Sequence, residues 1–215
     1  MTLAKEHQTG VILLCIMLFN TCLTVAQSRK WESATSKDGK IATKYSISTR
    51  SDENGNDVAL IESVTTATEK INMDRCIELM KDVSKHKFFH SDDSSTVVKT
   101  ISENEWIIYY YTEGTFFTPD ADGVYTLTFT EDKSNKTADF TIQAVPTLLE
   151  RTEAKRFTYL NKGYSFEDMK DGTVRITMTT RLSPAFRVPG WIMNMAFPHT
   201  FFDVMQKFIN LAHNE

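Results

Sequence analysis

Hydrophobic and polar residues alternate along most of the chain after residue 40, and this pattern is typical of β-strands. The alternating segments are 40–50, 58–68, 96–101, 105–113, 123–131, 137–145, 156–169 and 173–182. Short runs rich in Gly, Asp, Asn and Ser separate them, among them PDADG at 119–123 and the run at 131–136. Connections this short join antiparallel neighbours, so the pattern predicts an antiparallel sheet.

Three of these strands have one clearly apolar face, since side chains of a strand point alternately to opposite sides. These faces consist of Tyr125, Leu127 and Phe129; Phe140 and Ile142; and Val174, Ile176 and Met178. The strand at 105–113 is ambiguous, because both of its faces are apolar. One face carries Ile107, Tyr109 and Tyr111, and the other carries Trp106, Ile108 and Tyr110.

Two segments have helical periodicity. The first, 72–86, begins at Asn72, a residue type favoured as a helix cap. Its apolar positions are Met73, Cys76, Ile77, Met80 and Val83, which lie on one face of a helix. The second helix is predicted over 189–211, with Pro189 in its first turn, where a missing N–H breaks no bond. Pro198 removes a hydrogen bond inside this helix and predicts a kink.

The predicted C-terminal helix is unusually apolar. Its one narrow polar stripe consists of His199, Asp203, Gln206 and Asn210. Two adjoining stripes consist of Asn194, Phe197, Phe201, Val204 and Phe208, and of Trp191, Met195, Phe202, Met205 and Ile209. This apolar arc is wider than a single contact with a sheet needs. Two interpretations stay open: both stripes are plain core, or one packs on the strands while the other lines a cavity.

The first residues of the chain resemble a secretory signal peptide. A short polar lead precedes the apolar run at 11–19, and Thr24 and Ala26 are placed like the small residues before a cleavage site. We therefore predict a signal peptide, 1–26, cleaved after about Ala26, and one domain, 27–215. A membrane anchor is the alternative, but nine apolar residues are fewer than the ~20 needed to span a bilayer. A lipid-modified Cys22 is a lesser alternative.

Composition narrows the class of protein. The 215 residues carry a net charge of −4, so no basic face for a nucleic acid is expected. Two of the three cysteines, Cys15 and Cys22, lie in the predicted signal peptide. Cys76 alone would remain after cleavage, so the exported domain would have no internal disulfide. We therefore expect a periplasmic or secreted, soluble domain that depends on its hydrophobic core for stability.

No motif in the chain predicts catalysis, a metal site or a cofactor. His86 and His90 have a spacing that suits a metal on a helix, with Asp92 and Asp93 following, but no third ligand has a defined place. Asp120 and Asp122 flank a turn, which is a common use of Asp and a less common place for a catalytic pair. Cys76 is more typical of packing than of a nucleophile. Nucleophile elbows and phosphate-binding glycine loops are lacking, and the Asn135 glycosylation motif matters only in a eukaryotic secretory route.

The stretch VPGWIMN, 188–194, resembles the sequence that opens the last helix of the START family of lipid-transfer domains, and we expect an exported bacterial member. LMKDV at 79–83, TPDADGVYTLTF at 118–129 and the strands that follow agree with the family in order and spacing. The resemblance implies an α+β, helix-grip fold, in which a curved antiparallel sheet wraps around a long C-terminal helix with an apolar tunnel between them. The hydrophobic alternation alone, without the resemblance, also predicts a sheet covered by a helix.

Two departures from the family limit what the resemblance implies about cargo. The family's Arg-Asp pair is Ala121-Asp122 here. Family members with sterol cargo often carry buried charges on central strands, and matching strand to strand places Tyr111 and Leu127 there. A tyrosine and a leucine provide no charge, so sterol specificity is not implied.

The resemblance and the strand faces together predict a cavity and its lining. The lining is expected to be Tyr109, Tyr111, Tyr125, Leu127, Phe129, Phe140, Ile142, Ile176, Met178, Phe197, Phe201, Val204 and Met205. A gate is expected at Pro189, Trp191 and Pro198, with the loops 112–123 and 182–189. The expected partner is a lipid or another apolar small molecule, with transient membrane contact compatible with such cargo.

Two other classes of function stay open. An enzyme with an apolar substrate would need an acid or base in the tunnel. The candidates are Tyr109, Tyr111, Tyr125 and Tyr159, which are weak bases at neutral pH. An unpaired Asp, Glu or His that points into the cavity would favour catalysis. An interaction module with a collapsed cavity is the other alternative.

Overall fold

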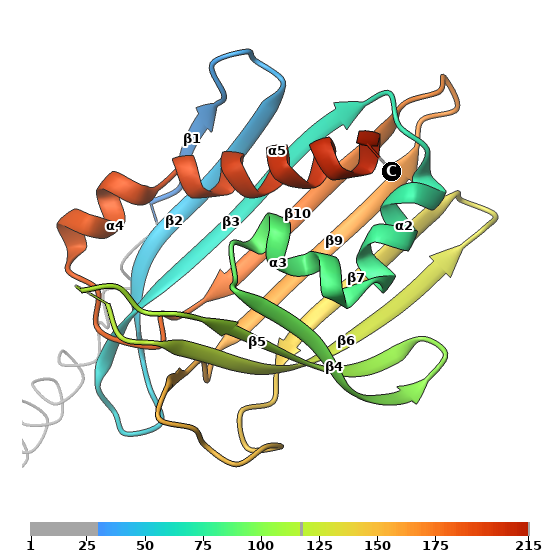
Figure 1. The fold of residues 1–215 in the computed structure, drawn as a ribbon. Helices are drawn as coiled ribbons and strands as arrows, with labels where there is room; N and C mark the ends of the chain where they lie inside the picture. Colours follow the sequence, from blue (N-terminus) through green and yellow to red (C-terminus); the bar gives the residue numbers. More distant parts are fainter. Residues whose placement is uncertain (1–29, 117, 215) are drawn as a thin grey trace, which may run out of the picture.

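A computed structural model describes residues 30–116 and 118–214 of the chain (Figure 1). It has one large curved β-sheet with its helices on one face, and the last helix crosses that face diagonally. The predicted α+β, helix-grip architecture is therefore confirmed. The predicted signal peptide, 1–26, lies outside the described residues. We call the sheet face that carries the helices the inner face.

The sheet has the strand order β1-β2-β3-β10-β9-β7-β6-β5-β4, with β8 beside β6. The strands are β1 (Glu32–Thr35), β2 (Ile41–Ser51), β3 (Asp57–Glu69), β4 (Ser94–Ser102), β5 (Glu105–Thr112), β6 (Ala121–Asp132), β7 (Thr137–Ala144), β8 (Lys155–Arg156), β9 (Leu160–Asp168) and β10 (Val174–Leu182). All the main-path neighbours pair antiparallel. Only β8 pairs in parallel.

The alternating segments predicted all the long strands, but two details differ. The short edge strand β1 was not predicted, because four mostly exposed residues carry little apolar signal. The segment 156–169 is not one strand. It divides into β8, which pairs with β6, and β9, which pairs with β7 and β10. The residues between them leave the sheet.

The helix predicted over 72–86 is shorter and is followed by two more turns: α2 (Met73–Lys81), the 3₁₀ turn η1 (Val83–Lys85) and α3 (His86–His90). Asn72 caps α2 as predicted, since its side chain accepts a bond from the Asp74 N–H at 2.8 Å. The helix ends at Asp82, whose carboxylate accepts from the Ser84 N–H and starts the next turn. Of the predicted stripe, Cys76, Met80 and Val83 are buried, whereas Met73 and Ile77 are partly buried.

The predicted kink at Pro198 is a complete break between two helices, α4 (Gly190–Ala196) and α5 (His199–Asn214). Phe197 has extended backbone angles, and its peptide bond to Pro198 is cis. The proline has no N–H to continue the helical bonds, so α5 starts afresh with Phe201 donating to the Pro198 carbonyl. Among the described residues, no helix is both long enough and apolar enough to cross a bilayer.

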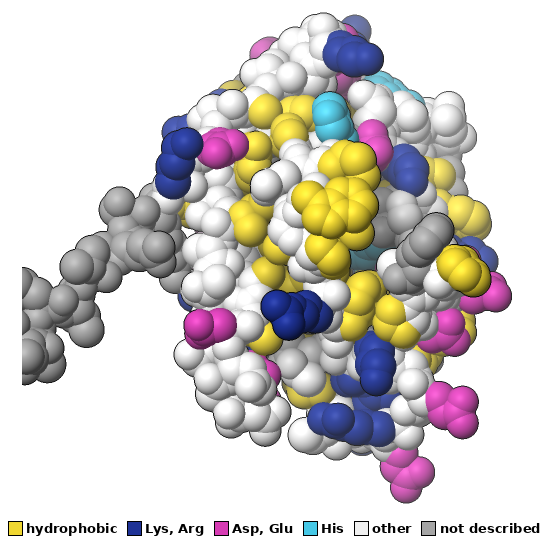
Figure 2. Space-filling view, turned by 90° about the vertical axis from the view of Figure 1, so that its left-hand side faces the viewer, with side chains coloured by type: hydrophobic (Ala, Val, Ile, Leu, Met, Phe, Trp, Pro, Cys, Tyr) yellow, Lys and Arg dark blue, Asp and Glu magenta, His cyan; other side chains and the backbone are white. Residues whose placement is uncertain are grey.

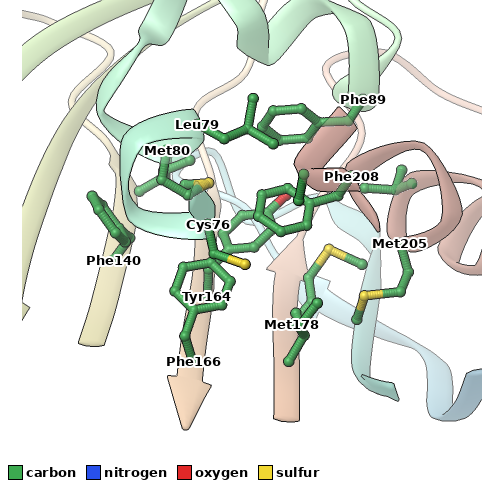
Figure 3. Packing of buried hydrophobic residues seen from close by; sticks show 14 of the residues in the cluster. Cys76, Leu79, Met80, Phe89, Phe140, Tyr164, Phe166, Met178, Met205 and Phe208 are labelled. Carbon is green, nitrogen blue, oxygen red and sulfur yellow. The ribbon is translucent and has the colours of Figure 1, made fainter. Parts of the chain in front are cut away.

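Phe208 of α5 lies at the centre of the core, and none of its surface is exposed. Its ring packs edge-on against Phe89 of α3 at 5.3 Å and stacks on Phe166 of β9 at 5.6 Å (Figure 3). It also contacts Tyr164 of β9, with 5.8 Å between ring centroids. The Phe208 side chain thus joins α5 to α3 and to the sheet.

We predict that Phe208→Ala lowers the free energy of unfolding by about 3–5 kcal/mol, because the truncation leaves a cavity among three aromatic rings. Chemical denaturation followed by circular dichroism measures the change. Met195→Ala on exposed α4 is the control and should shift stability by about 0.5 kcal/mol or less. Equal effects of the two substitutions would contradict this account of the core.

Candidate functional site: the inner face of the sheet

The inner face presents most of the residues predicted to line a cavity. Strand pairing places Leu127 opposite Ile142, Phe129 opposite Phe140, and Met178 opposite Tyr164. These side chains, with Tyr125 and Ile176, are buried beneath the helices. From α5, Phe201, Val204 and Met205 are buried as well. The predicted faces of these strands are confirmed, while their role as the lining of a ligand cavity stays a prediction.

The predictions for Tyr109 and Tyr111 are wrong, because both side chains lie on the outer face of the sheet. The Tyr109 hydroxyl donates to Asp122 at 3.2 Å, and the Tyr111 hydroxyl donates to Asp120 at 2.6 Å. Tyr110 takes the inner face instead and is buried there. The sequence pattern did not decide which face of this strand points inward. In the structure, hydrogen bonds to Asp120 and Asp122 hold Tyr109 and Tyr111 on the outer face.

The side chain of Tyr125 lies back along β6 over Gly123, where the absence of a side chain leaves room for the ring. A Cβ atom added at Gly123 would lie 1.8 Å from the Tyr125 hydroxyl oxygen. The ring also lies 5.2 Å from that of Tyr110. Burial raises the pKa of Tyr125 well above its usual value, so the residue is a poor candidate for a base.

The inner face is packed unevenly from one end of the strands to the other. At the end beneath α2 and the C-terminal half of α5, Phe166, Ile176 and Phe140 have almost no exposed surface. At the end from which α4 emerges, the inner-face residues Ile47, Ala144, Leu160 and Leu182 are only partly buried. We call this end of the inner face, where these side chains keep part of their surface exposed, the loosely packed end.

The predicted gate residues lie at this loosely packed end. Pro189 precedes α4, and Pro198 separates α4 from α5. No residue of α4 is buried, and Trp191 and Met195 are 67% and 66% exposed. Figure 2 shows hydrophobic side chains gathered on the side of the molecule where α4 lies. Phe197 stacks on Phe201 at 4.8 Å and so joins the break to the core.

His86 has a structural role, because both of its ring nitrogens are hydrogen-bonded within the protein. Its Nε2 donates to the Met80 carbonyl at 2.8 Å, and its Nδ1 accepts from the Tyr110 hydroxyl at 2.5 Å. Burial lowers the pKa of His86 to about 4, so the ring is neutral near pH 7. Among the described residues, no group of three potential ligands could hold a metal ion.

A buried polar cluster was missed by the sequence analysis. His90 Nε2 bonds to the Tyr164 hydroxyl at 2.5 Å, while its Nδ1 lies 4.0 Å from the Asp92 carboxylate. The Asp92 carboxylate also accepts from the Thr112 hydroxyl at 2.9 Å. Burial raises the pKa of Asp92 to about 6.

Lys162 completes this cluster and was also missed. It alternates in phase with Leu160, Tyr164 and Phe166 along β9, so its side chain leaves the strand on the inner face. The negative charge of Asp92 raises the pKa of Lys162, although the two side chains form no ion pair. The alternation of Leu160, Tyr164 and Phe166 could have identified Lys162, but the whole stretch 156–169 was interpreted as one strand without an assigned face.

Asp122 was expected in a turn, but it forms a buried ion pair on the outer side of β6. Arg156 donates to it from Nε and Nη2, both at 2.7 Å, and Thr152 donates at 2.9 Å. Arg156 also donates to three backbone carbonyls of the loop before β8, those of Pro146, Leu149 and Glu150. Burial opposes ionisation of Asp122, but these bonds outweigh it and lower its pKa.

Cys76 is buried in the core, in agreement with the packing interpretation. Burial raises the pKa of its thiol to about 12, which disfavours the thiolate that a nucleophile needs. An open hollow of ≈ 410 Å³ lies elsewhere, among Lys40, Thr68, Glu69, Arg175 and their neighbours at one margin of the sheet. It is separate from the loosely packed end of the inner face.

Solved structures share this arrangement, although no family model and no curated protein matches the sequence. A STAR-related lipid transfer protein (fragment 25–204) from Xanthomonas axonopodis superposes with a TM-score of 0.69 at 19% identity, covering 85% of this chain and 98% of that one. Human StAR-related lipid transfer protein 5 superposes with a TM-score of 0.66 at 8% identity, covering 97% of this chain and 96% of that one. The chain has the fold of START domains. The aromatase/cyclase ZhuI of Streptomyces sp. R1128 superposes more distantly, with a TM-score of 0.50 at 10% identity, covering 72% of this chain and 94% of that one.

We predict that Arg156→Met lowers the free energy of unfolding by about 3–5 kcal/mol, because it leaves the Asp122 carboxylate buried without its partner. The variant Arg156→Lys should be intermediate, since lysine cannot make the two parallel bonds. Urea denaturation measures both, with Arg175→Met, on an exposed ion pair, as the control. An unchanged stability of Arg156→Met would refute the structural role of this pair.

Proposed function

We propose that the protein binds a lipid or another apolar small molecule between the inner face of the sheet and the C-terminal helices. The observation that carries the proposal is the uneven packing of the inner face, which is apolar and dense at one end and only partly buried at the α4 end. The START fold supports it, since proteins that share this fold are named for lipid transfer. Each methylene moved out of water contributes about 0.8 kcal/mol, so one acyl chain suffices for useful affinity.

In this proposal α4 acts as the gate. It is a separate short helix with no buried residue, and the break at Pro198 divides it from the anchored α5. Movement of α4 would change access to the α4 end of the inner face without disturbing the packing of Phe208. The loops 112–123 and 182–189 border the same end. Trp191 and Met195 are exposed apolar side chains that would suit transient contact with a membrane.

Uptake of a fluorescent fatty acid or sterol by the delipidated protein tests the proposal, and we predict one molecule bound per chain. Mass spectrometry of the natively purified protein should detect a bound apolar molecule. Because space is expected only at the α4 end, Leu160→Trp should reduce uptake while Val64→Trp, on the outer face, should not. Absence of uptake across a lipid panel would favour the alternative of an interaction module with a collapsed cavity.

Catalysis on an apolar substrate is a second candidate function, and the cluster of His90, Asp92 and Lys162 favours it. These groups supply a base and an acid on the inner side, as an acid–base mechanism needs. The outward Tyr109 and Tyr111 cannot serve in the interior. Recovery of a chemically changed ligand from wild-type protein, and of the unchanged ligand from Asp92→Asn, would favour an enzyme.

We also propose that the protein is exported and that its signal peptide is removed after about Ala26. The support is the sequence alone: the polar lead, the apolar run at 11–19 and the small residues at Thr24 and Ala26. We predict that the mature protein expressed with its full leader begins near Gln27, which N-terminal sequencing checks. Retention of the leader on the mature protein would contradict this.

A further inference from the structure

Lys162 projects a cation onto the inner face of an otherwise apolar sheet. Its neighbours of the same phase on β9, Tyr164 and Leu160, belong to the core and to its rim. Across the sheet it pairs with Ile142 of β7 and Thr180 of β10. Its side chain is only partly buried, so part of its surface remains accessible at the loosely packed end.

The ammonium of Lys162 has no hydrogen-bond or ion-pair partner among the described residues. Its interactions with charged groups are electrostatic only. The Asp92 carboxylate raises the pKa of Lys162, and Lys162 in turn lowers the pKa of His86 and His90. A lysine that is enclosed by protein normally finds a carboxylate or carbonyl, because an unpaired charge is costly in such a place. The Lys162 Nζ is not fully buried, so its three donor hydrogens are open to solvent and to an acceptor from another molecule.

A row of polar side chains extends from Lys162 across the inner face. Lys162 pairs with Thr180, and Thr180 pairs with Ser63 of β3. Thr180 and Ser63 are both buried, and the Ser63 hydroxyl lacks a hydrogen-bond partner among the described residues. Buried hydroxyls are nearly always bonded, so this row is a second indication of a polar group that belongs here.

We propose that Lys162 binds the anionic head group of a lipid whose apolar chain lies along the loosely packed end of the inner face. This inference rests on the proposed function and names the class of its cargo. Thr180 would donate a second hydrogen bond to the head group. The chain would pass Leu160, one two-residue step of ~7 Å along β9, and then cross the sheet by Leu182, which pairs with Leu160, towards Ile47 of β2.

The charges around Lys162 favour a head group with a single negative charge. Asp92 is the only other group of the cluster that is charged near neutral pH, since burial keeps His86 and His90 neutral and keeps Tyr110, Tyr125 and Tyr164 protonated. Because the Asp92 carboxylate already offsets the Lys162 ammonium, each further negative charge adds repulsion, and a monoanionic head group meets less of it than a dianionic phosphate monoester does. A fatty-acid carboxylate and a phosphodiester both satisfy this condition.

The charge of Lys162 near neutral pH is compatible with binding an anionic head group. Burial lowers the pKa of Lys162 to about 8, and the nearby Asp92 carboxylate opposes the shift. The ammonium therefore stays mostly protonated at neutral pH, and an anionic ligand would stabilise it further. The head group would enter as a partner for the partly buried ammonium, so binding would pair the charge as the remaining solvent is removed from it.

Binding of matched ligands tests the inference. Palmitate, hexadecanol and palmitoyl-lysophosphatidylglycerol share one chain and differ in head group, and each would displace a neutral pyrenyl-alkane probe from the delipidated protein. We predict that Lys162→Met weakens palmitate binding about ten-fold or more and hexadecanol binding less than about two-fold. Lys162→Arg should keep most of the affinity for palmitate. Lys44→Met, on the exposed outer face, is the matched control.

The possible results separate this inference from the proposed function. If wild-type protein binds neither palmitate nor hexadecanol, the proposed function fails. If it binds both and Lys162→Met changes neither, apolar binding stands and the role of Lys162 is overturned. A loss with lysophosphatidylglycerol as well as palmitate supports an anionic head in general, and a loss with palmitate alone identifies a carboxylate. Thermal melts of all variants confirm that each is folded, since a methionine in place of a buried charge should not destabilise.

Discussion

The packing of Phe208 against α3 and β9 is the contact on which the arrangement of the inner face depends. It joins the C-terminal helix to the sheet at one end of the strands, where Phe89, Tyr164 and Phe166 surround it. Phe201, Val204 and Met205 bury the other half of α5 as well, so the helix is anchored from its first turn onwards. The dense end of the inner face is the part that these rings, α2 and the C-terminal half of α5 cover.

The polar residues of the interior are distributed in the same uneven way. His86 is fully bonded and belongs to the dense part, where it joins α2 to β5 through Met80 and Tyr110. Lys162, Asp92 and Ser63 lie towards the loosely packed end, where Asp92 accepts from Thr112 and the Ser63 hydroxyl has no partner among the described residues. The Asp122–Arg156 pair is on the other side of the sheet, where it holds the loop before β8. On the outer face, charge therefore serves structure through the Asp122–Arg156 pair.

Much of the fold could be predicted from alternation, because a strand with one apolar face can bury it in only one way. The faces of Leu127, Phe140 and Ile176 follow directly from this rule. The strand with Tyr109, Tyr110 and Tyr111 could not be assigned, since hydrophobicity is equal on its two sides and the decision depends on aspartates distant in sequence. Lys162 went unnoticed for the opposite reason: a lysine in a strand suggests solvent, and only the position of β9 between β7 and β10 encloses it. The break at Pro198 was predicted as a kink, since the sequence does not show how far a helix resumes beyond a proline.

The absence of any buried residue on α4 has an energetic consequence for how the described part of the chain fluctuates. Segments that bury little apolar surface open with small free energies, whereas those in the core open only with the whole domain. The backbone amides of α4 should therefore exchange with solvent far faster than those of α5, although the two helices are neighbours in sequence. The molecule would carry two regimes of motion on either side of residue 198, with the slower one set by the global stability of the sheet.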